Sequence, residues 1–156
     1  MIEIIFLGTG TSQGIPIIGS THPVCQSQNP KDKRLRASLA LKWNRSFFVI
    51  DCGPDFRQQM INCGTKTLDG ILYTHEHADH TAGLDDIRPF YFRQGEINLI
   101  LTKRVLNFLR KRFDYIFENY NKYPGAPSVK VKIIDKNKKF ILANKEIIPI
   151  EVLHGQ

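Results

Sequence analysis

The sequence lacks the features of an exported or membrane-bound protein. No apolar run approaches the roughly 20 residues needed to cross a membrane, so we expect no membrane association. The first residues, Met1 to Glu3, lack the basic start and long apolar stretch of a signal peptide. Cysteine is scarce, and Cys25, Cys52 and Cys63 are odd in number and follow no repeated spacing. This cysteine usage is typical of a reducing compartment, and we expect a cytoplasmic protein.

Acidic residues are fewer than basic ones. The 156 residues include 22 Lys and Arg against 15 Asp and Glu, a formal net charge of +7 that favours anionic partners. Much of the positive charge lies in three runs, at residues 31–36, 110–112 and 136–139. Such runs are more often solvated faces than binding sites, so they are compatible with an anionic substrate without establishing one. The length predicts one domain, 1–156, with a real hydrophobic core.

The chain alternates short apolar runs with turn residues, as expected for a mixed α and β protein. Strands are predicted at residues 1–7, 37–43, 46–51, 70–73, 97–101, 129–134, 139–142 and 146–153, with a hairpin turn at 44–45. Helices are predicted at residues 55–63, 83–87 and 103–120, the first ended by Gly64. An apolar stripe of the last helix is expected to face the core: Val105, Phe108, Leu109, Phe113, Ile116, Phe117 and Tyr120. The other side is expected to face water: Arg104, Asn107, Lys111, Asp114 and Glu118.

Three histidines and two carboxylates occupy six consecutive positions, from His75 to His80. The cluster directly follows the predicted strand at 70–73, so it lies in the loop at the carboxyl end of that strand. Imidazole and carboxylate are ligands for zinc, iron and manganese. His75 and His77 can point to one side of this loop while Asp79 and His80 point to the other, so one loop can serve two ions. A purely structural zinc site usually contains cysteine, and this cluster has none.

These residues match the His-x-His-x-Asp-His signature of the metallo-β-lactamase-fold hydrolases, which the chain resembles along its whole length. Residues 4–11 resemble the opening strand and glycine turn of that superfamily, and we expect the glycines to permit a tight turn near the metal site. Asp51 resembles its early strand-ending aspartate, and His154 resembles its next metal-binding histidine. The resemblance implies an α+β fold, the αβ/βα sandwich of the superfamily, of which this chain holds only the N-terminal part.

Relatives also carry a bridging aspartate and a last histidine downstream of the equivalent of His154, for which this sequence has no room. We therefore expect a fragment of a longer protein, with an unusual incomplete relative as the alternative. As given, the chain is expected to be inactive or impaired as an enzyme, because these downstream ligands are absent.

The resemblance also implies a role for each site residue. His75, His77 and His154 would hold one metal ion. Asp79 and His80 would hold a second ion and act as catalytic residues. Asp51 would hydrogen-bond to the histidine loop and orient it. The implied cofactors are two divalent metal ions, zinc first, with manganese or iron as alternatives.

A second group of candidate ligands lies in the polar loop at residues 19–36. In the phosphodiesterase relatives this loop resembles a structural zinc knuckle built from three cysteines, but here the matching positions are Ser20, His22 and Cys25. One ligand is therefore lost and another is changed. A weakened structural zinc site with His22 and Cys25 as ligands and an ordinary loop are equal alternatives.

Within the superfamily, residues 14–38 most resemble the phosphodiesterase branch, which includes the phosphoribosyl cyclic phosphodiesterase and, more distantly, ribonuclease Z. The implied function is a metal-dependent hydrolase that attacks a small or cyclic anionic phosphodiester with a water activated between two metal ions. The alternatives are ribonuclease Z-like processing of RNA, with nucleic acid as the partner, and a non-catalytic metal-binding fragment. A homodimer is left open.

Overall fold

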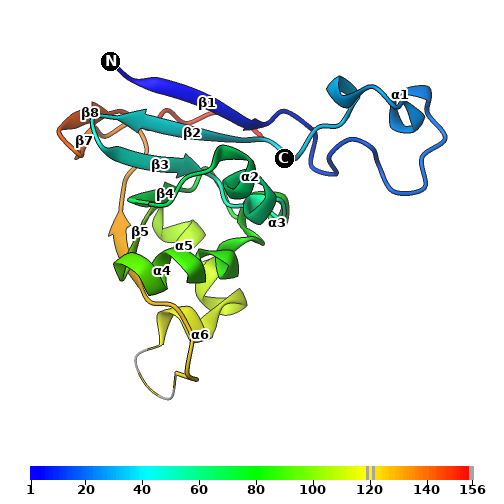
Figure 1. Cartoon of the computed structure of the whole chain (residues 1–156). Helices are drawn as coiled ribbons and strands as arrows, with labels where there is room; N and C mark the ends of the chain where they lie inside the picture. Colours follow the sequence, from blue (N-terminus) through cyan, green and yellow to red (C-terminus); the bar gives the residue numbers. More distant parts are fainter. Residues whose placement is uncertain (119, 121, 155–156) are drawn as a thin grey trace.

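A six-stranded mixed sheet forms the centre of the computed structural model, which describes residues 1–118, 120 and 122–154 (Figure 1). The strands lie in the sheet in the order of the sequence: β1 (Glu3–Gly8), β2 (Ser38–Trp43), β3 (Ser46–Ile50), β4 (Gly70–Leu72), β5 (Ile97–Leu101) and β6 (Val129–Ile133). The first two pairs are antiparallel, and the last three are parallel. Because parallel strands end at the same edge of a sheet, the loops that follow β3, β4 and β5 lie side by side.

The hairpin predicted at residues 37–51 is confirmed. β2 and β3 pair from Leu39 with Ile50 to Trp43 with Ser46. Asn44, in the turn, has a φ of 53°, a left-handed conformation that asparagine tolerates better than most residues. Local turn chemistry and alternating apolar residues were therefore sufficient to predict this unit.

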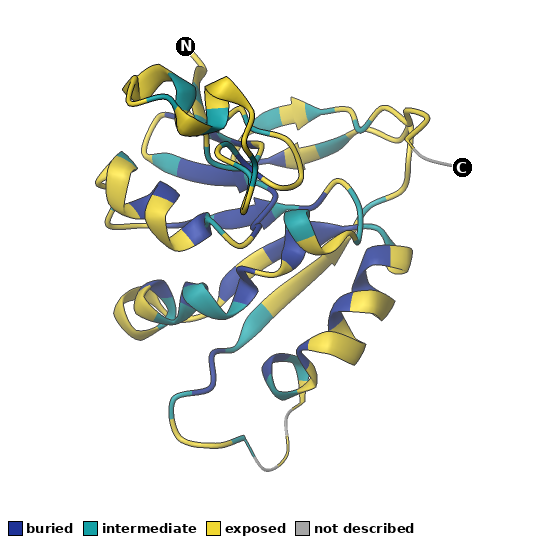
Figure 2. Ribbon diagram, turned by 90° about the vertical axis from the view of Figure 1, so that its right-hand side faces the viewer, coloured by how far each residue is buried: buried dark blue, intermediate teal, exposed yellow. Residues whose placement is uncertain are grey.

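Helices pack against one face of the sheet. They are α2 (Phe56–Cys63), α3 (Ala78–Thr81), α4 (Arg88–Gln94), α5 (Lys103–Arg112) and α6 (Asp114–Phe117), with a short 3-10 helix η2 (Leu84–Ile87) before α4. Strand residues such as Val49 and Leu99 share one buried core with Phe56, Leu84 and Leu109 of these elements. Figure 2 shows the buried residues of the helices turned inward and the exposed ones outward. α2 ends at Gly64, whose φ is 67°, as the sequence predicted.

A small hairpin packs against the other face of the sheet. It consists of β7 (Phe140–Leu142) and β8 (Lys145–Ile147). Leu142 joins a second buried cluster with Trp43, Phe48 and Ile100. Nε1 of Trp43 donates a hydrogen bond to the carbonyl oxygen of Ala143 at 3.0 Å, which ties the turn of this hairpin to β2.

The single helix predicted at residues 103–120 is wrong, because the helix is broken. α5 ends at Arg112, and Phe113 leaves the helical conformation with a φ of −130° before α6 begins. The side chain of Phe113 stays buried. Packing of this aromatic ring into the core therefore overrides the helical continuity that the apolar spacing predicted.

The apolar stripe predicted for this segment is right in part. Val105 and Leu109 are buried, but Phe108 and Tyr120 are 49% and 84% exposed. The buried face of α5 is centred on Val105, Leu106 and Leu109, so Phe108 lies at its edge, and the break after α5 changes the helical phase before Tyr120. The residues predicted to face water are exposed: Arg104, Asn107, Lys111, Asp114 and Glu118.

The strand predicted at residues 146–153 is wrong over most of its length. β8 ends at Ile147, and residues 148–153 pair with no strand of the described chain. Pro149 has no amide hydrogen for a ladder, and its carbonyl oxygen accepts a hydrogen bond from the amide of Asn137 at 2.8 Å. Ile150 and Val152 are 76% and 75% exposed. Alternating apolar residues form a strand only where a neighbouring edge pairs with them.

Residues 19–36 form an arm that projects from the body (Figure 1). The segment predicted as a loop includes two short helical turns, α1 (Pro23–Gln26) and η1 (Pro30–Asp32). At its base, the backbones of Ile15 and Arg34 exchange two hydrogen bonds of 2.8 Å, and Arg36 pairs with Asp55 at 3.0 Å. The arm is therefore anchored at the point where it leaves the sheet.

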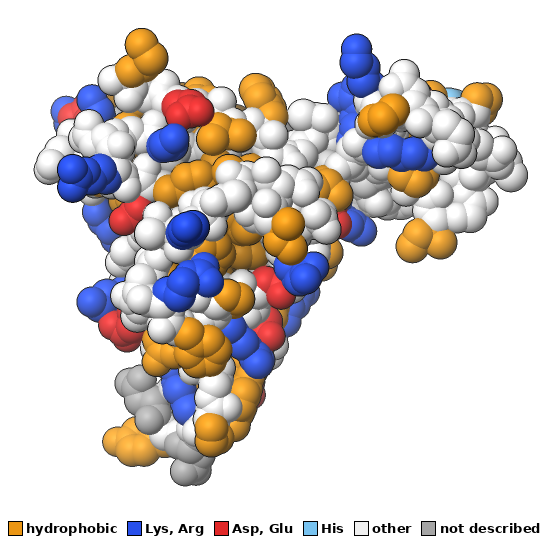
Figure 3. Space-filling view, viewed as in Figure 1, with side chains coloured by type: hydrophobic (Ala, Val, Ile, Leu, Met, Phe, Trp, Pro, Cys, Tyr) orange, Lys and Arg blue, Asp and Glu red, His pale blue; other side chains and the backbone are white. Residues whose placement is uncertain are grey.

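Basic side chains are spread over the surface. Figure 3 shows Lys and Arg in several separate groups on one face, including the arm. The three basic runs of the sequence lie in the arm, at the end of α5 and before β7. Within the described chain, none of the helices combines the length and the apolar character needed to cross a membrane.

Candidate metal centre

The histidine loop, residues 74–81, follows β4 at the edge of the sheet where the parallel strands end. Its first part has no regular secondary structure and includes His75 and His77. His77 is the N-cap of α3, whose first turn includes Asp79 and His80. α3 was not predicted from the sequence, because one turn of helix is too short to show a periodic pattern.

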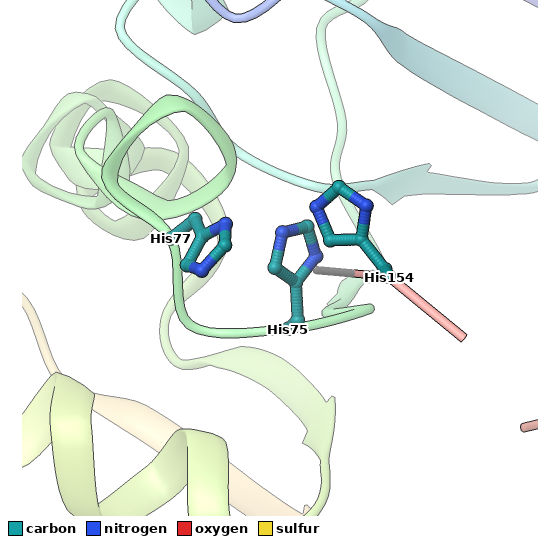
Figure 4. Close-up of side chains that lie close together, drawn as sticks. All are labelled: His75, His77 and His154. Atoms are coloured by element: carbon teal, nitrogen blue, oxygen red, sulfur yellow. The ribbon is translucent and has the colours of Figure 1, made fainter. Parts of the chain in front are cut away.

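Three histidines converge beside this loop (Figure 4). One ring nitrogen from each of His75, His77 and His154 lies within 4.8 Å of the other two. The ring centroids are 4.5 Å apart for His75 and His77, 4.8 Å for His75 and His154, and 5.5 Å for His77 and His154. Three imidazoles at this spacing can share one divalent ion.

His75 has the orientation of a metal ligand. Its Nδ1 lies 2.9 Å from Oγ1 of Thr74, and that hydroxyl donates to Oδ2 of Asp51 at 2.7 Å. The Thr74 oxygen therefore accepts the Nδ1 proton, which leaves the lone pair on Nε2. Nε2 is buried and has no hydrogen-bond partner among the described residues. Burial, and then the neighbouring His80, lower the pKa of His75 and favour the neutral form that binds metal. These donors fit a divalent ion such as zinc.

Asp51 lies beneath the histidine loop, directly after β3. Its buried carboxylate accepts hydrogen bonds from the amide of Thr74 at 2.8 Å, from the hydroxyl of Thr74, and from Nδ1 of His80 at 2.7 Å. Its φ of 63° is uncommon for aspartate and turns the chain away from the strand direction. The structure thus places Asp51 where it can orient both Thr74 and His80.

Asp79 and His80 form a pair next to the three histidines. Nε2 of His80 lies 3.2 Å from Oδ2 of Asp79, and the rings of His80 and His75 have centroids 4.2 Å apart. The hydrogen bond to Asp51 raises the pKa of His80, against the effect of burial. Among the described residues, the group of three that can share an ion includes neither Asp79 nor His80. A second ion held by this pair remains a prediction.

Two glycines allow the histidine loop to lie against the chain that follows β3. A Cβ atom on Gly53 would lie 2.0 Å from the carbonyl oxygen of Asp79, and one on Gly83 would lie 2.1 Å from the carbonyl oxygen of Gly53. The amide of Cys52 donates to the carbonyl of His80 at 2.8 Å, and the amide of Gly83 donates to the carbonyl of Cys52 at 2.9 Å. The positions of Asp79 and His80 therefore depend on a backbone contact that leaves no room for a side chain.

A cavity of about 480 Å³ opens beside the histidines. Its lining includes side chains of the candidate metal site: His77, Asp79, His80 and His154. The rest of its lining comes from the glycine turn after β1 and from the residue that precedes β2: Gly10, Thr11, Ser12 and Ala37. The expected tight turn therefore lies near the site, and it adds two hydroxyl groups to a space of the size of small-molecule sites.

His22 and Cys25 lie in the arm, and their contacts are local. Nδ1 of His22 accepts a hydrogen bond from the amide of Val24 at 3.3 Å, as the cap of α1. Sγ of Cys25 accepts one from the amide of Ile17 at 3.5 Å, and the hydroxyl of Ser20 accepts one from the amide of His22 at 3.2 Å. No group of three ligands in the described residues includes His22 or Cys25. Structural zinc here remains a prediction of the resemblance.

Three residues of the histidine loop make contacts that the sequence did not predict. The hydroxyl of Thr74 lies between two side chains of the site. Glu76 pairs with Arg104 of α5, and Thr81 accepts a hydrogen bond from Arg112 at 3.1 Å. Because 28 and 31 residues separate the members of these last two pairs, no local pattern connects them.

Comparison with known proteins identifies the family. The family model of the beta-lactamase superfamily domain matches residues 47–156, more than half of the chain. An octanoyltransferase of Porphyromonas gingivalis (strain W83) is 39% identical over 99% of this chain and 31% of that protein. Ribonuclease Z of Bacillus subtilis is 26% identical over 99% of this chain and 46% of its own length. The chain thus spans less than half the length of these curated relatives.

Solved structures agree with this assignment. A diphosphatase from the PhnP family superimposes with a TM-score of 0.87 at 35% identity, over 99% of this chain and 59% of that chain. Zn²⁺-bound PqqB from Methylobacterium extorquens superimposes with a TM-score of 0.77 at 19% identity, over 97% of this chain and 56% of that chain. The expected metallo-β-lactamase fold, covered in part, is confirmed. The chain belongs to the beta-lactamase superfamily.

Proposed function

We propose that this member of the beta-lactamase superfamily is a metal-dependent hydrolase, a phosphodiesterase that acts on a small or cyclic phosphodiester. The observation that carries the proposal is the convergence of His75, His77 and His154 beside a cavity, where the buried Nε2 of His75 has no partner among the described residues. A buried lone pair directed toward two further imidazoles suits a cation and costs free energy without one.

The residues of the site would hold two divalent ions. His75, His77 and His154 are the ligands of the first ion. Asp79 and His80 are two of the ligands of the second ion. Zinc, or manganese or iron in its place, would lower the pKa of a water molecule there and offset the charge that grows on phosphoryl oxygens. The chain itself supplies the positions of these ligands and a cavity for the substrate.

Asp51 and Thr74 would set the direction of the imidazole rings. Thr74 holds Nδ1 of His75, and Asp51 holds Nδ1 of His80, so that each ring presents Nε2. Both supports meet at Oδ2 of Asp51. Hydrogen bonds of this kind fix the tautomer and the orientation of ligating histidines.

The cavity and the charge of the chain favour a small anionic substrate. The volume of about 480 Å³ suits a small molecule, and the hydroxyls of Thr11 and Ser12 can donate to phosphoryl or sugar oxygens. The net charge of +7 attracts anions. Similarity to a diphosphatase at 35% identity supports chemistry at phosphorus, and it makes a substituted diphosphate the second substrate to test.

RNA is the alternative substrate. The similarity to ribonuclease Z and the positive charge of the chain support this reading. Binding to RNA through its phosphates would weaken steeply as salt concentration rises, because counterions are released on binding. Turnover of a small diester would change much less, so the salt dependence separates the two substrates.

A substrate panel tests the proposal. The zinc-loaded chain is offered a bis-aryl phosphate, a cyclic nucleotide analogue, a substituted diphosphate, an aryl monophosphate and a β-lactam. We expect turnover of diesters above monoesters and lactams, because a diester places one negative charge between two cations. His77→Ala should lower turnover by orders of magnitude with an unchanged circular dichroism spectrum, whereas His22→Ala, in the arm, should leave turnover unchanged.

Metal content gives a second readout. Asp79 and His80 belong to no complete ligand group in the described chain, so we expect tight binding of one zinc ion and weaker binding of another. Hydrolysis of lactams with none of diesters would contradict the phosphodiesterase proposal. Unchanged diester turnover in His77→Ala would show that the histidine loop takes no part in the mechanism.

A further inference from the structure

We propose that Arg104 and Arg112 of α5 are positioning residues for the metal site, which hold the histidine loop from its outer side. The proposal rests on the proposed function, because it assumes that this loop binds a metal ion. Both arginines belong to the part of the sequence expected to be solvated, and neither is a candidate ligand. Each nevertheless contacts the loop, one near each end of α5.

The first tether joins Arg104 to Glu76. Nε of Arg104 donates to Oε1 of Glu76 at 2.8 Å, and Nη2 donates to the same oxygen. The side chain of Glu76 is only 10% exposed, whereas that of Arg104 is 77% exposed. Glu76 lies between His75 and His77 in the chain, so its attachment to α5 restrains the backbone that carries both imidazoles.

The second tether joins Arg112 to Thr81. Nη1 of Arg112 donates to Oγ1 of Thr81 at 3.1 Å, and this hydroxyl donates to the carbonyl oxygen of His77 at 2.9 Å. Thr81 is fully buried. The contact therefore reaches the backbone of His77 through one hydroxyl, from the end of α5 opposite to Arg104.

α5 is a rigid base for these tethers. Val105 and Leu109 are each 1% exposed in the core beneath the helix. The two arginines are eight residues apart, which corresponds to about 12 Å along a helix. Two attachments at this separation restrain both the position and the rotation of the histidine loop, which one attachment cannot do.

A purely electrostatic role predicts a different outcome. A guanidinium near the site repels a bound cation, and the carboxylate of Glu76 attracts it. If charge alone mattered, Arg104→Met would strengthen metal binding. If Arg104 positions the loop, Arg104→Met weakens metal binding even though it removes a positive charge. The sign of the change therefore identifies the mechanism.

The test measures Co²⁺ binding to the full 156-residue chain by visible absorption, for wild type and for five variants. Arg104→Met, Glu76→Ala and Arg112→Met should each lower the affinity about tenfold, the scale of lost outer contacts around metal ligands. The double variant Arg104→Met/Glu76→Ala should bind Co²⁺ no more weakly than either single variant, because both substitutions remove the same interaction. Arg110→Met is the matched control: it removes a positive charge from the same turns of α5, and among the contacts of the described residues Arg110 has none to the loop. This variant should bind Co²⁺ as wild type does.

Amide hydrogen exchange of the metal-free chain gives a second measurement. Residues 74–81 should exchange faster in Arg104→Met and Arg112→Met than in Arg110→Met, and Arg104→Lys should restore part of the protection. Tighter Co²⁺ binding by Arg104→Met, or unchanged binding and exchange in both arginine variants, would overturn the inference and leave the proposed function intact. Failure of the wild-type chain to bind Co²⁺ would overturn the proposed function, and this inference with it.

Discussion

Oδ2 of Asp51 lies 2.7 Å from Nδ1 of His80, although 29 residues separate them in the chain. The two residues meet because β3 and β4 are parallel neighbours, so that the segments after them emerge at one edge of the sheet. The same oxygen accepts the hydroxyl proton of Thr74, which supports His75. One carboxylate thus connects the candidate ligands of both metal positions.

Asp51→Asn should weaken metal binding without unfolding the chain. Asparagine has the same shape but has an NH₂ donor in place of one acceptor oxygen, so it cannot accept from the amide of Thr74 and also from the Thr74 hydroxyl and His80, as the carboxylate does. We expect zinc affinity to fall about 10- to 100-fold, measured by competition with a chelating dye. Asp135→Asn is the control, because Asp135 pairs only with Lys138 in an exposed turn among the contacts of the described chain. Equal zinc affinity in both variants would mean that Asp51 does not orient the ligands.

Gly53→Ala should destabilise the fold and the metal site together. A methyl group at this position would lie 2.0 Å from the carbonyl oxygen of Asp79, so α3 must move. We expect a loss of about 2 kcal/mol in the free energy of unfolding, measured with urea, together with weaker zinc binding. Gly64→Ala is the control: its φ of 67° strains alanine by about 1 kcal/mol, but no atom within 4 Å obstructs the new methyl group. That variant should lose stability and keep its zinc affinity.

Tyr115 should make the chain less stable in alkaline solution. Burial, and then the hydrogen bond that its hydroxyl donates to Asp85 at 2.6 Å, raise the pKa of Tyr115 well above its ordinary value near 10. Above about pH 10 the unfolded chain loses this proton while the folded chain keeps it. The stabilising contribution of Tyr115 is therefore complete below pH 10 and declines as the pH rises further.

Urea unfolding between about pH 8 and about pH 11 measures this decline. Wild type should lose more unfolding free energy over this interval than Tyr115→Phe, which has no phenolic proton. Tyr120→Phe serves as the control, because Tyr120 is 84% exposed, and it should follow wild type. Parallel curves for wild type and Tyr115→Phe would contradict the prediction.

The three cysteines should react with iodoacetamide in a defined order. The hydroxyl of Ser20, and then the amide of Ile17, lower the pKa of Cys25, which increases its thiolate fraction. Burial raises the pKa of Cys63, and raises that of the fully buried Cys52 much further. Peptide mass spectrometry should show alkylation of Cys25 first, Cys63 next and Cys52 last. Early labelling of Cys52 in the folded chain would show that the core near the site opens readily.

The sequence alone determined the parts of this protein that depend on neighbouring residues. The turn at Asn44, the end of α2 at Gly64 and the spacing of His75 and His77 after a short strand all have local causes, namely backbone preference and residue periodicity. The family signature of the histidine loop is likewise a pattern of neighbouring residues. These features were predictable because each is contained within a few consecutive residues.

Only the tertiary structure decided which distant residues meet. It brought His154 beside His75, placed the carboxylate of Asp51 under the loop, and attached Glu76 to Arg104. Packing also broke the predicted helix at Phe113 and left residues 148–153 without a strand partner in the described chain. The physical reason is that such contacts depend on strand order and core packing, which involve residues far apart in the chain, whereas periodicity records only whether a side chain is apolar.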